Sequence, residues 1–294
     1  MNTKSKKIFY KIVNYKIFRI LRFLISLEPI KFTFRYIFLL IYYSRSENKK
    51  SFRGPIADNN GWYFSEISTK SKKLLNESYS KYLDQPVFHI TKKNIYALEE
   101  IFSKVSNPII EYLGPEAKLD GLFFIFSKAS FRSVSSSWHT DNVGSRLKAF
   151  VCIEGDGTQP TLIFPPSNRN FNFTYLIKNY WIELLRWFGI EYKLNIESSI
   201  SLKHTRNSIY IFDTKYLHRG AYEIGNKDRL ILVLEFSDPR KHKIFSRGFL
   251  KGPIGTNESN KFFIDLNVIL SEEMKNMLDK KRIKYKKHII EYSN

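Results

Sequence analysis

The sequence predicts a mainly β core, a barrel or a sandwich, with flanking helices (α+β). Two observations indicate this fold class. From Gly121 onward the hydrophobic residues fall in short runs that are rich in β-branched and aromatic side chains and are separated by Gly, Asn, Asp and Pro, a pattern typical of strands. Before Gly121 they recur at helical spacing instead. The expected strands are residues 122–126, 147–153, 161–164, 209–212 and 230–236.

Helices are expected on both sides of these strands. The spacing of apolar residues predicts helices at 64–84 and 92–112, within a helical lead-in of about 62–115, and another at 175–188 inside a long insertion, 168–203. An insertion of that length is typical of a functional lid. We therefore expect three parts: a basic N-terminal segment (1–50), a main domain (51–250) and a basic helical extension (251–294) whose last helix covers 271–294.

The composition limits the class of protein. A chain of 294 residues can bury one substantial core, and 43% hydrophobic with 16% aromatic residues excludes a disordered protein. The single cysteine, Cys152, rules out an internal disulfide and a cysteine zinc site. The net charge of +20 favours anionic partners such as nucleic acid, anionic lipid or acidic substrates. Nucleic acid is disfavoured, because no helix-turn-helix, zinc-finger or basic–aromatic pattern is present.

Residues 1–50 differ from the rest, with twelve Lys or Arg and two Glu. Apolar residues at near-helical spacing between these charges predict a basic amphipathic helix that ends at Pro29. The longest uncharged apolar run, 36–43, is far shorter than the roughly 20 residues of a membrane span. Arg19 and Arg22 interrupt the apolar stretch that a signal peptide would need.

Two interpretations of this segment stay open. The helix packs on the barrel with its charges in water, or residues 1–43 bind an anionic membrane surface. In either case we expect a cytoplasmic protein, and in the second case one at the cytoplasmic face of the membrane.

The segment His139-Thr140-Asp141 carries the most specific signal. Alternate residues of a strand point to the same face, so His139 and Asp141 can reach one metal ion from a single strand end, and the distant His218 can complete the set. Two imidazoles and one carboxylate on one face of an octahedron are the ligands of non-haem iron(II) oxygenases, and they leave three positions open. Two of these suit the keto acid end of 2-oxoglutarate, and the third suits O2. These three residues are the predicted iron(II) ligands and catalytic centre.

Arg229 follows eleven residues after His218, at the start of an apolar run. If a turn through 225–226 joins two strands, Arg229 projects inward beside the metal. Its planar guanidinium can bind the far carboxylate of 2-oxoglutarate with two parallel hydrogen bonds, which lysine does less specifically. Arg229 is therefore the predicted co-substrate anchor.

These residues resemble the phytanoyl-CoA dioxygenase family of iron(II)/2-oxoglutarate oxygenases over roughly residues 121–238. The Trp-His-Thr-Asp at 138–141 is similar to the family's Trp-His-x-Asp signature, and residues 207–220 resemble its second metal strand. Arg229 stands where the 2-oxoglutarate arginine of the family falls. Residues 163–168 are similar to its Pro-Gly-Ser-His loop, although proline and asparagine replace the glycine and histidine.

The resemblance implies a double-stranded β-helix core, also called a jelly roll or cupin-like fold. It also implies oxidation of a small molecule or a lipid-like substrate. Similar positions in the family suggest that Lys128 and Trp138, near the mouth of the barrel, help to hold 2-oxoglutarate.

Each candidate also has a structural interpretation. His139 and Asp141 would be a surface pair and His218 a core histidine. Arg229 would form a salt bridge with Asp213 or Glu235, Lys128 would be solvated, and Trp138 would pack in the core. The remaining histidines lack matching partners and are interpreted as structural or exposed: His89, His204, His242 and His288.

The sequence thus predicts an iron(II)/2-oxoglutarate-dependent dioxygenase that hydroxylates a C–H bond and releases succinate and CO2. Hydroxylation is favoured over halogenation because Asp141 keeps the carboxylate that halogenating relatives lose. The alternatives are a catalytically silent metal-binding β-barrel that acts as a scaffold or binding protein, and a protein or nucleic-acid hydroxylase.

Overall fold

The computed structural model describes most of the predicted main domain. Its described residues are 53–81, 87–89, 92–129, 138–141, 146–164, 173–187, 198–220, 225–237, 263–269, 272–281 and 284–285, with single positions at 33, 34, 37, 41, 190 and 192. The predicted amphipathic helix before Pro29, His242 and His288 lie outside these residues.

The larger of two sheets contains all but one of the strands predicted from the sequence. Its order is β1 (Trp62–Glu66), β7 (Ser208–Asp213), β4 (Arg146–Glu154), β9 (Arg229–Ser237), β3 (Lys118–Ser127), β10 (Phe263–Ile269) and β2 (Val87–His89), with β11 (Lys284–Tyr285) added beside β3. Neighbours from β1 to β10 pair antiparallel, whereas β10 with β2 and β11 with β3 pair parallel.

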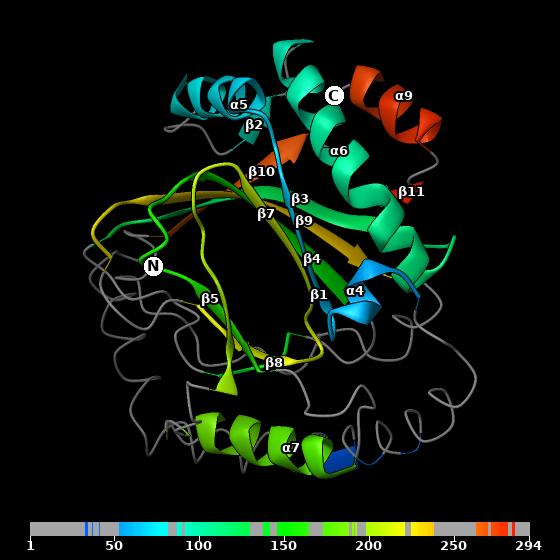
Figure 1. Cartoon of the computed structure of the whole chain (residues 1–294), viewed down its shortest axis with the longest axis vertical. Helices are drawn as coiled ribbons and strands as arrows, with labels where there is room; N and C mark the ends of the chain where they lie inside the picture. The colour runs from blue at the N-terminus through cyan, green and yellow to red at the C-terminus, as the bar shows by residue number, and fades with distance from the viewer. Residues whose placement is uncertain are drawn as a thin grey trace, which may run out of the picture.

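The smaller sheet faces the larger one and has the order β6 (Ile200–Leu202), β5 (Thr161–Phe164) and β8 (Leu217–Arg219). A single bridge joins His139 to His218 on the other side of β8. Figure 1 shows the two sheets enclosing a common interior. The predicted double-stranded β-helix core is therefore confirmed.

Helices cover the outer faces of both sheets. Figure 1 shows α5 (Thr69–Lys81), α6 (Lys92–Leu113) and α9 (Glu272–Lys280) over the larger sheet, and α7 (Phe173–Trp187) beyond the smaller one; the short α4 (Pro55–Asp58) precedes β1. No helix among the residues that the structure describes is long and apolar enough to cross a membrane.

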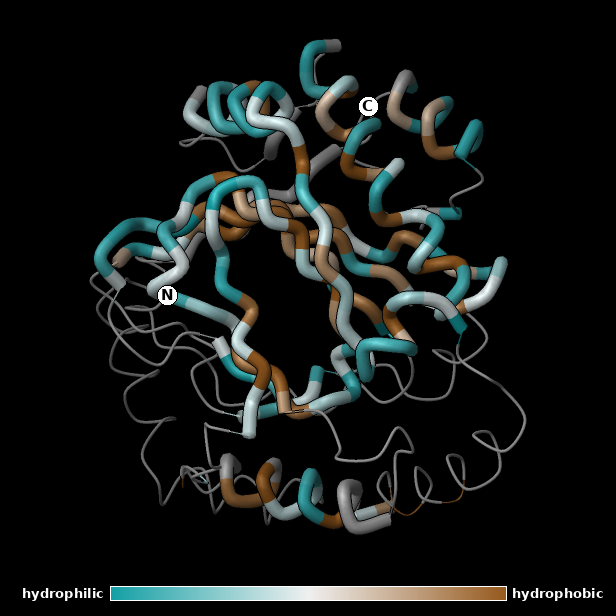
Figure 2. The backbone as a smooth tube through the Cα atoms, in the orientation of Figure 1, coloured by the Kyte–Doolittle hydropathy of each residue, from teal (hydrophilic) through white to brown (hydrophobic). Residues whose placement is uncertain are grey.

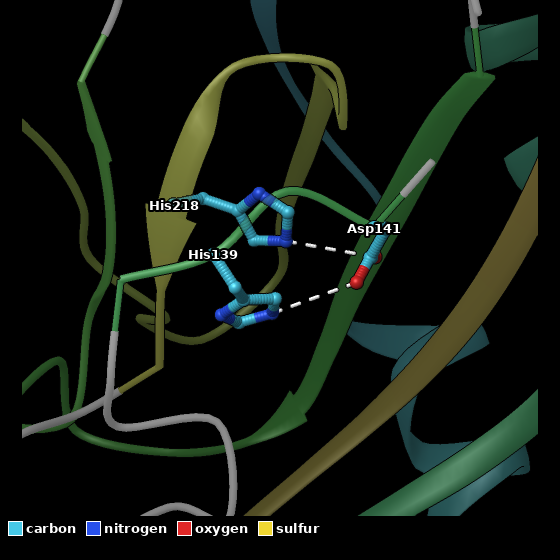
Figure 3. A group of neighbouring side chains, drawn as sticks. All are labelled: His139, Asp141 and His218. Carbon is cyan, nitrogen blue, oxygen red and sulfur yellow. Dashed lines mark ion pairs between the residues drawn. The ribbon is translucent and has the colours of Figure 1, made fainter. Parts of the chain in front are cut away.

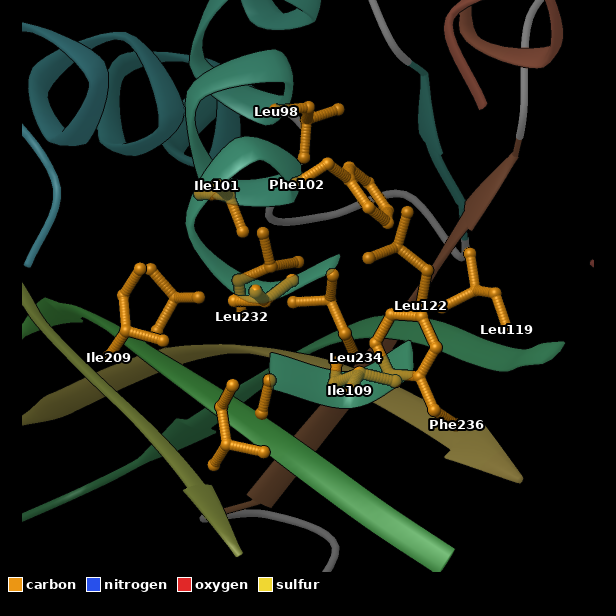
Figure 4. Packing of buried hydrophobic residues seen from close by; sticks show 14 of the residues in the cluster. Leu98, Ile101, Phe102, Ile109, Leu119, Leu122, Ile209, Leu232, Leu234 and Phe236 are labelled. Carbon is orange, nitrogen blue, oxygen red and sulfur yellow. The ribbon is translucent and has the colours of Figure 1, made fainter. Parts of the chain in front are cut away.

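Side chains of β9 point alternately to the two faces of the larger sheet. Its even-numbered residues, such as Leu232, Leu234 and Phe236, pack against Leu98 and Phe102 of α6 in the cluster that Figure 4 shows. Its odd-numbered residues point to the opposite face, into the barrel. Figure 2 shows the resulting hydrophobic character of the strands. This division is what turns Arg229 and Glu235 toward the interior.

Three local expectations differ from the structure. The expected helix at 64–84 begins only at Thr69, because residues 62–66 instead form β1 and hydrogen-bond along the edge of β7. Part of the expected lid, Ile200–Leu202, is strand β6 of the smaller sheet. In the C-terminal extension, β10 and β11 both pair with β3, and helix α9 has only nine residues.

Candidate metal centre

His139, Asp141 and His218 converge inside the barrel. One ligand atom from each lies within 4.8 Å of the others, and all three residues are buried. The Nε2 atoms of His139 and His218 each lie 3.5 Å from a different oxygen of the Asp141 carboxylate. Figure 3 shows both imidazoles turned toward this carboxylate. The arrangement is that of a single metal site and excludes a surface pair.

Backbone contacts fix the two histidines beside each other. The amide of His139 donates to the carbonyl of His218 at 3.0 Å, and the amide of His218 donates back at 2.9 Å. The Nδ1 atom of His218 lies 2.9 Å from the carbonyl oxygen of Tyr216. Because a carbonyl oxygen can only accept, Nδ1 must carry the hydrogen, and the lone pair of His218 is on Nε2, facing Asp141.

A chain of ion pairs leads from Asp141 through Lys148 and Glu235 to Arg146. Lys148 forms an ion pair with the Oδ2 atom of Asp141 and lies 3.5 Å from Glu235, which in turn pairs with Arg146. Lys148 and Glu235 are directly opposite each other on β4 and β9. No local pattern in the sequence predicts this network, since only the strand register brings the two charges together.

This network keeps Asp141 ionised. Burial alone would raise the pKa of Asp141, but the charge of the adjacent Lys148 holds that pKa well below its usual value. Asp141 is therefore a carboxylate at neutral pH. Together with two imidazoles it forms a buried, oxygen- and nitrogen-donating set that fits iron(II) and leaves positions open.

Arg229 is buried at the start of β9, as expected for an inward-facing residue. Its Nη1 atom donates to the carbonyl of Gln159 at 2.8 Å, and its Nη2 atom lies 3.5 Å from the hydroxyl of Ser127, its cross-strand neighbour. Burial lowers the pKa of Arg229 to about 10, so the guanidinium is still charged at neutral pH. The carboxylates proposed as structural partners are engaged elsewhere: Asp213 with Tyr112 and Lys215, and Glu235 with Arg146 and Lys148.

Arg229 therefore has no carboxylate partner among the residues that the structure describes. A buried cation that contacts only neutral groups is costly unless an anion joins it. Gly225 leaves room for Gln159 beside Arg229, since a Cβ atom at position 225 would lie only 2.6 Å from the Gln159 side chain. An anionic ligand beside Arg229 would remove this cost.

His204 lies in the same part of the interior. It is 1% exposed, and its Nε2 atom lies 2.8 Å from the hydroxyl of Thr161. Burial and the charge of Arg229 hold the pKa of His204 well below 6.5, so the ring is neutral. The interpretation of His204 as structural or exposed is therefore refined: it is buried and lines the barrel.

An aromatic series connects the metal end of the interior with His204. The ring centroid of Phe212 lies 5.4 Å from that of His218 and 5.0 Å from that of Phe150, and Phe150 lies 5.7 Å from His204. Two apolar rings thus lie in contact between His218 and His204.

Lys128 and Trp138, the other two predicted co-substrate contacts, have different surroundings. Lys128 is exposed, and its neighbour Ser127 is the residue that faces Arg229. Trp138 is buried, packs edge-on against Phe164 and lies under the guanidinium of Arg219, 5.0 Å from ring to charge. The structural interpretation thus fits both residues. The side chain of His89 lies outside the described residues.

The sequence matches no protein-family model and no curated protein. Solved structures with similar folds include the non-haem monooxygenase ThoJ (10% identity, TM-score 0.44, 63% of this chain and 78% of that one). HygX from Streptomyces hygroscopicus with iron bound gives 10% identity, a TM-score of 0.43, and coverage of 63% and 85%. EvdO2 from Micromonospora carbonacea with 2-oxoglutarate gives 13% identity and a TM-score of 0.40, with coverage of 61% of this chain and 86% of that one. At these identities and TM-scores, the function of this chain has to be inferred from its own side chains.

Proposed function

We propose that this protein is an iron(II)/2-oxoglutarate-dependent dioxygenase that hydroxylates a C–H bond of a small-molecule or lipid-like substrate. One observation carries the proposal. Inside a single barrel, a buried His-Asp-His triad shares the interior with a buried arginine that has no carboxylate partner in the described part of the chain. The first feature suits a divalent metal, and the second suits the far end of a dicarboxylic acid.

Each residue has a defined role in this reaction. The Nε2 atoms of His139 and His218 and the carboxylate of Asp141 would hold iron(II), which when bound supplies open positions for a keto acid and for O2. Arg229 would bind the distal carboxylate of 2-oxoglutarate with charge-assisted hydrogen bonds. Lys148 and Glu235 would keep Asp141 oriented, as outer partners of metal ligands do.

The reaction balances as R–H plus 2-oxoglutarate plus O2 giving R–OH, succinate and CO2. One oxygen atom enters succinate and the other enters the product. The rings of Phe212 and Phe150 pack against each other between His218 and His204, and an apolar lining of this kind would strengthen charge contacts made beside it.

Relationship to the phytanoyl-CoA dioxygenase group is part of the proposal and rests on the Trp-His-x-Asp motif and the position of Arg229. The substrate class follows from the same resemblance. A binding protein that kept the metal but lost turnover would share the geometry, and succinate formation separates the two.

The test is succinate release by the purified protein, measured by mass spectrometry with iron(II), 2-oxoglutarate and O2. We expect succinate formation that depends on all three components. His218→Ala should abolish it. Thr161→Ala, which changes a neighbouring strand position without touching a metal ligand, is the control and should keep iron-dependent turnover. Succinate formation by His218→Ala would rule out the proposed centre.

A further inference from the structure

We propose that one face of the protein, formed by positions 33, 34, 37 and 41 and the outer side of α7, docks on an anionic membrane surface. We call it the apolar face and define it by Phe34, Ile37, Ile41, Ile177 and Trp181. The inference goes beyond the proposed reaction, because docking needs neither metal nor co-substrate.

Exposed apolar side chains gather on this face. Among the described residues, nine large hydrophobic side chains are exposed, and seven of them come from positions 34–41 and 177–192. Phe34 is 67% exposed and Trp181 is 53% exposed. Single exposed hydrophobic residues are normal on soluble proteins, but a contiguous group marks an interaction surface.

The spacing shows that each segment turns one apolar side to solvent. Phe34, Ile37 and Ile41 recur at intervals of three and four, as do Ile177 and Trp181 on α7. The other side of α7 is used inside the protein, where Asn179 and Ile182 are each 2% exposed. The apolar face is thus additional to the side by which α7 packs on the smaller sheet.

The two segments meet, so that they form one face. The hydroxyls of Thr33 and Tyr180 lie 3.2 Å apart, with Tyr180 next to Trp181 in α7. Figure 1 shows the described part of residues 33–41, in dark blue, beside one end of α7. Contact between the N-terminal segment and α7 therefore leaves the apolar side chains of both in solvent.

Charge selects the partner. The twelve Lys or Arg and two Glu of residues 1–50 give this segment a net charge of +10. A second copy of the chain would bring an equal positive charge against it, since a two-fold interface repeats the same surface on both subunits. An anionic lipid surface offers apolar depth together with negative charge, which a basic amphipathic segment requires for reversible binding.

The experiment is co-sedimentation of the full chain with vesicles of phosphatidylcholine, alone or mixed with phosphatidylserine. We expect binding to the mixed vesicles only, and a loss of binding at high salt, because surface charge is screened. Phe34→Ser and Trp181→Ser should each lower the partition coefficient roughly tenfold, the effect of removing one buried aromatic side chain.

Tyr96→Ser is the matched control. Tyr96 is 52% exposed, nearly as much as Trp181, but lies on α6 at the other side of the barrel. Its replacement should leave binding unchanged. Trp181→Phe keeps an apolar ring and should bind like the natural protein while losing the lipid-induced shift in tryptophan fluorescence.

Three results would overturn the proposal. The full chain could ignore mixed vesicles at low salt, or Tyr96→Ser could weaken binding as much as Trp181→Ser. Sedimentation without lipid could also show a dimer that Trp181→Ser dissociates, which would make a second copy the partner.

Discussion

At the metal triad each charged side chain that the structure describes is balanced by one of opposite sign. At the start of β9, by contrast, the described residues that contact Arg229 are all neutral. Around Asp141, the cations Lys148 and Arg146 alternate with the carboxylate of Glu235. Around Arg229 lie a carbonyl, a hydroxyl and the neutral ring of His204. We call the surroundings of the triad the metal level and the surroundings of Arg229 the anion level. Among the described residues, the charges of the metal level are balanced, whereas no carboxylate balances Arg229 at the anion level.

The difference indicates what each level binds. A balanced network holds its side chains in place before a ligand arrives, and this suits ligands of a metal whose geometry must be exact. A buried cation without a counter-ion makes folding less favourable, and a bound anion removes that cost. The unbalanced level is therefore expected to bind the charged end of a ligand, and mutations at the two levels should separate metal binding from co-substrate binding.

The largest effect is expected at the metal level. Asp141→Asn removes the one anionic ligand, so iron(II) or cobalt(II) affinity measured by calorimetry should fall roughly 100-fold or more, beyond the loss from outer partners alone. Succinate formation should disappear.

Asp213→Asn is the matched control, because Asp213 is equally buried but bonds Tyr112 and Lys215. This variant should lose about 3 kcal/mol of stability and still bind one metal ion at low temperature. Equal loss of metal from both variants would mean that Asp141 acts only through the fold.

The next effect is expected at the anion level. The test measures the affinity for 2-oxoglutarate and for 2-oxobutyrate, which has the same keto acid end but no distal carboxylate. Replacing Arg229 with Gln should weaken 2-oxoglutarate binding by roughly one to three orders of magnitude, the loss of one charged pair in a desolvated site. Binding of 2-oxobutyrate should barely change, so the variant should no longer distinguish the two acids.

A second buried arginine provides the control. Arg219 is 4% exposed and stacks on Trp138, so Arg219→Gln should keep the preference for 2-oxoglutarate. The preference should also decline as pH rises past about 10, where Arg229 loses its proton. If Arg229→Gln keeps the preference, the distal carboxylate is held elsewhere.

Much of the fold could be predicted because strand signals are local. Each of the five predicted runs lies within an observed strand, since β-branched and aromatic residues favour a pleated, buried surface over their own length. β2 and β10 could not be predicted, because Val87 pairs with Asn267 from a distant part of the chain. β1 overlaps the start of the predicted helix at 64–84, since a strand of five residues is too short to show a period.

The same distinction applies to the site. His139 and Asp141 share a local motif, and the distance to His218 and Arg229 completed a known pattern. Lys148 and Glu235 have no local signal other than a charge inside an apolar strand, and their pairing exists only through the register of β4 with β9. His204 lacked a sequence motif, and its place in the barrel depends on the pairing of Thr161 with Leu202.

A smaller effect is expected from the outer partner of Asp141. If Lys148 fixes the carboxylate, Lys148→Met should weaken metal binding roughly 10- to 100-fold. Glu235→Gln, which leaves Lys148 in place but removes its anchor, should change affinity in the same direction and by less. Tighter metal binding in Lys148→Met would show that the ammonium competes with the ion for Asp141. Cobalt(II) absorption spectra should change shape in Lys148→Met, a readout that altered stability alone does not move.

The smallest effect concerns the neutral ring beside Arg229. The pKa of His204 is held well below 6.5 by burial and by the charge of Arg229, so the folded protein does not take up a proton there, whereas the unfolded chain does below about pH 6.5. Stability due to His204 is therefore fully present above that pH and is lost as pH falls, by at most about 1.4 kcal/mol per pH unit. His204→Gln keeps a polar group for Thr161 and should flatten the dependence of urea-unfolding free energy on pH by up to one proton. Because carboxylates titrate alike in both proteins, their contribution cancels in the comparison.

A bound dicarboxylate would offset the charge of Arg229, so 2-oxoglutarate should reduce the difference between the two curves. Parallel curves without ligand would show that the His204 ring takes up a proton in the folded protein, and the level of Arg229 would then hold more positive charge than the structure indicates.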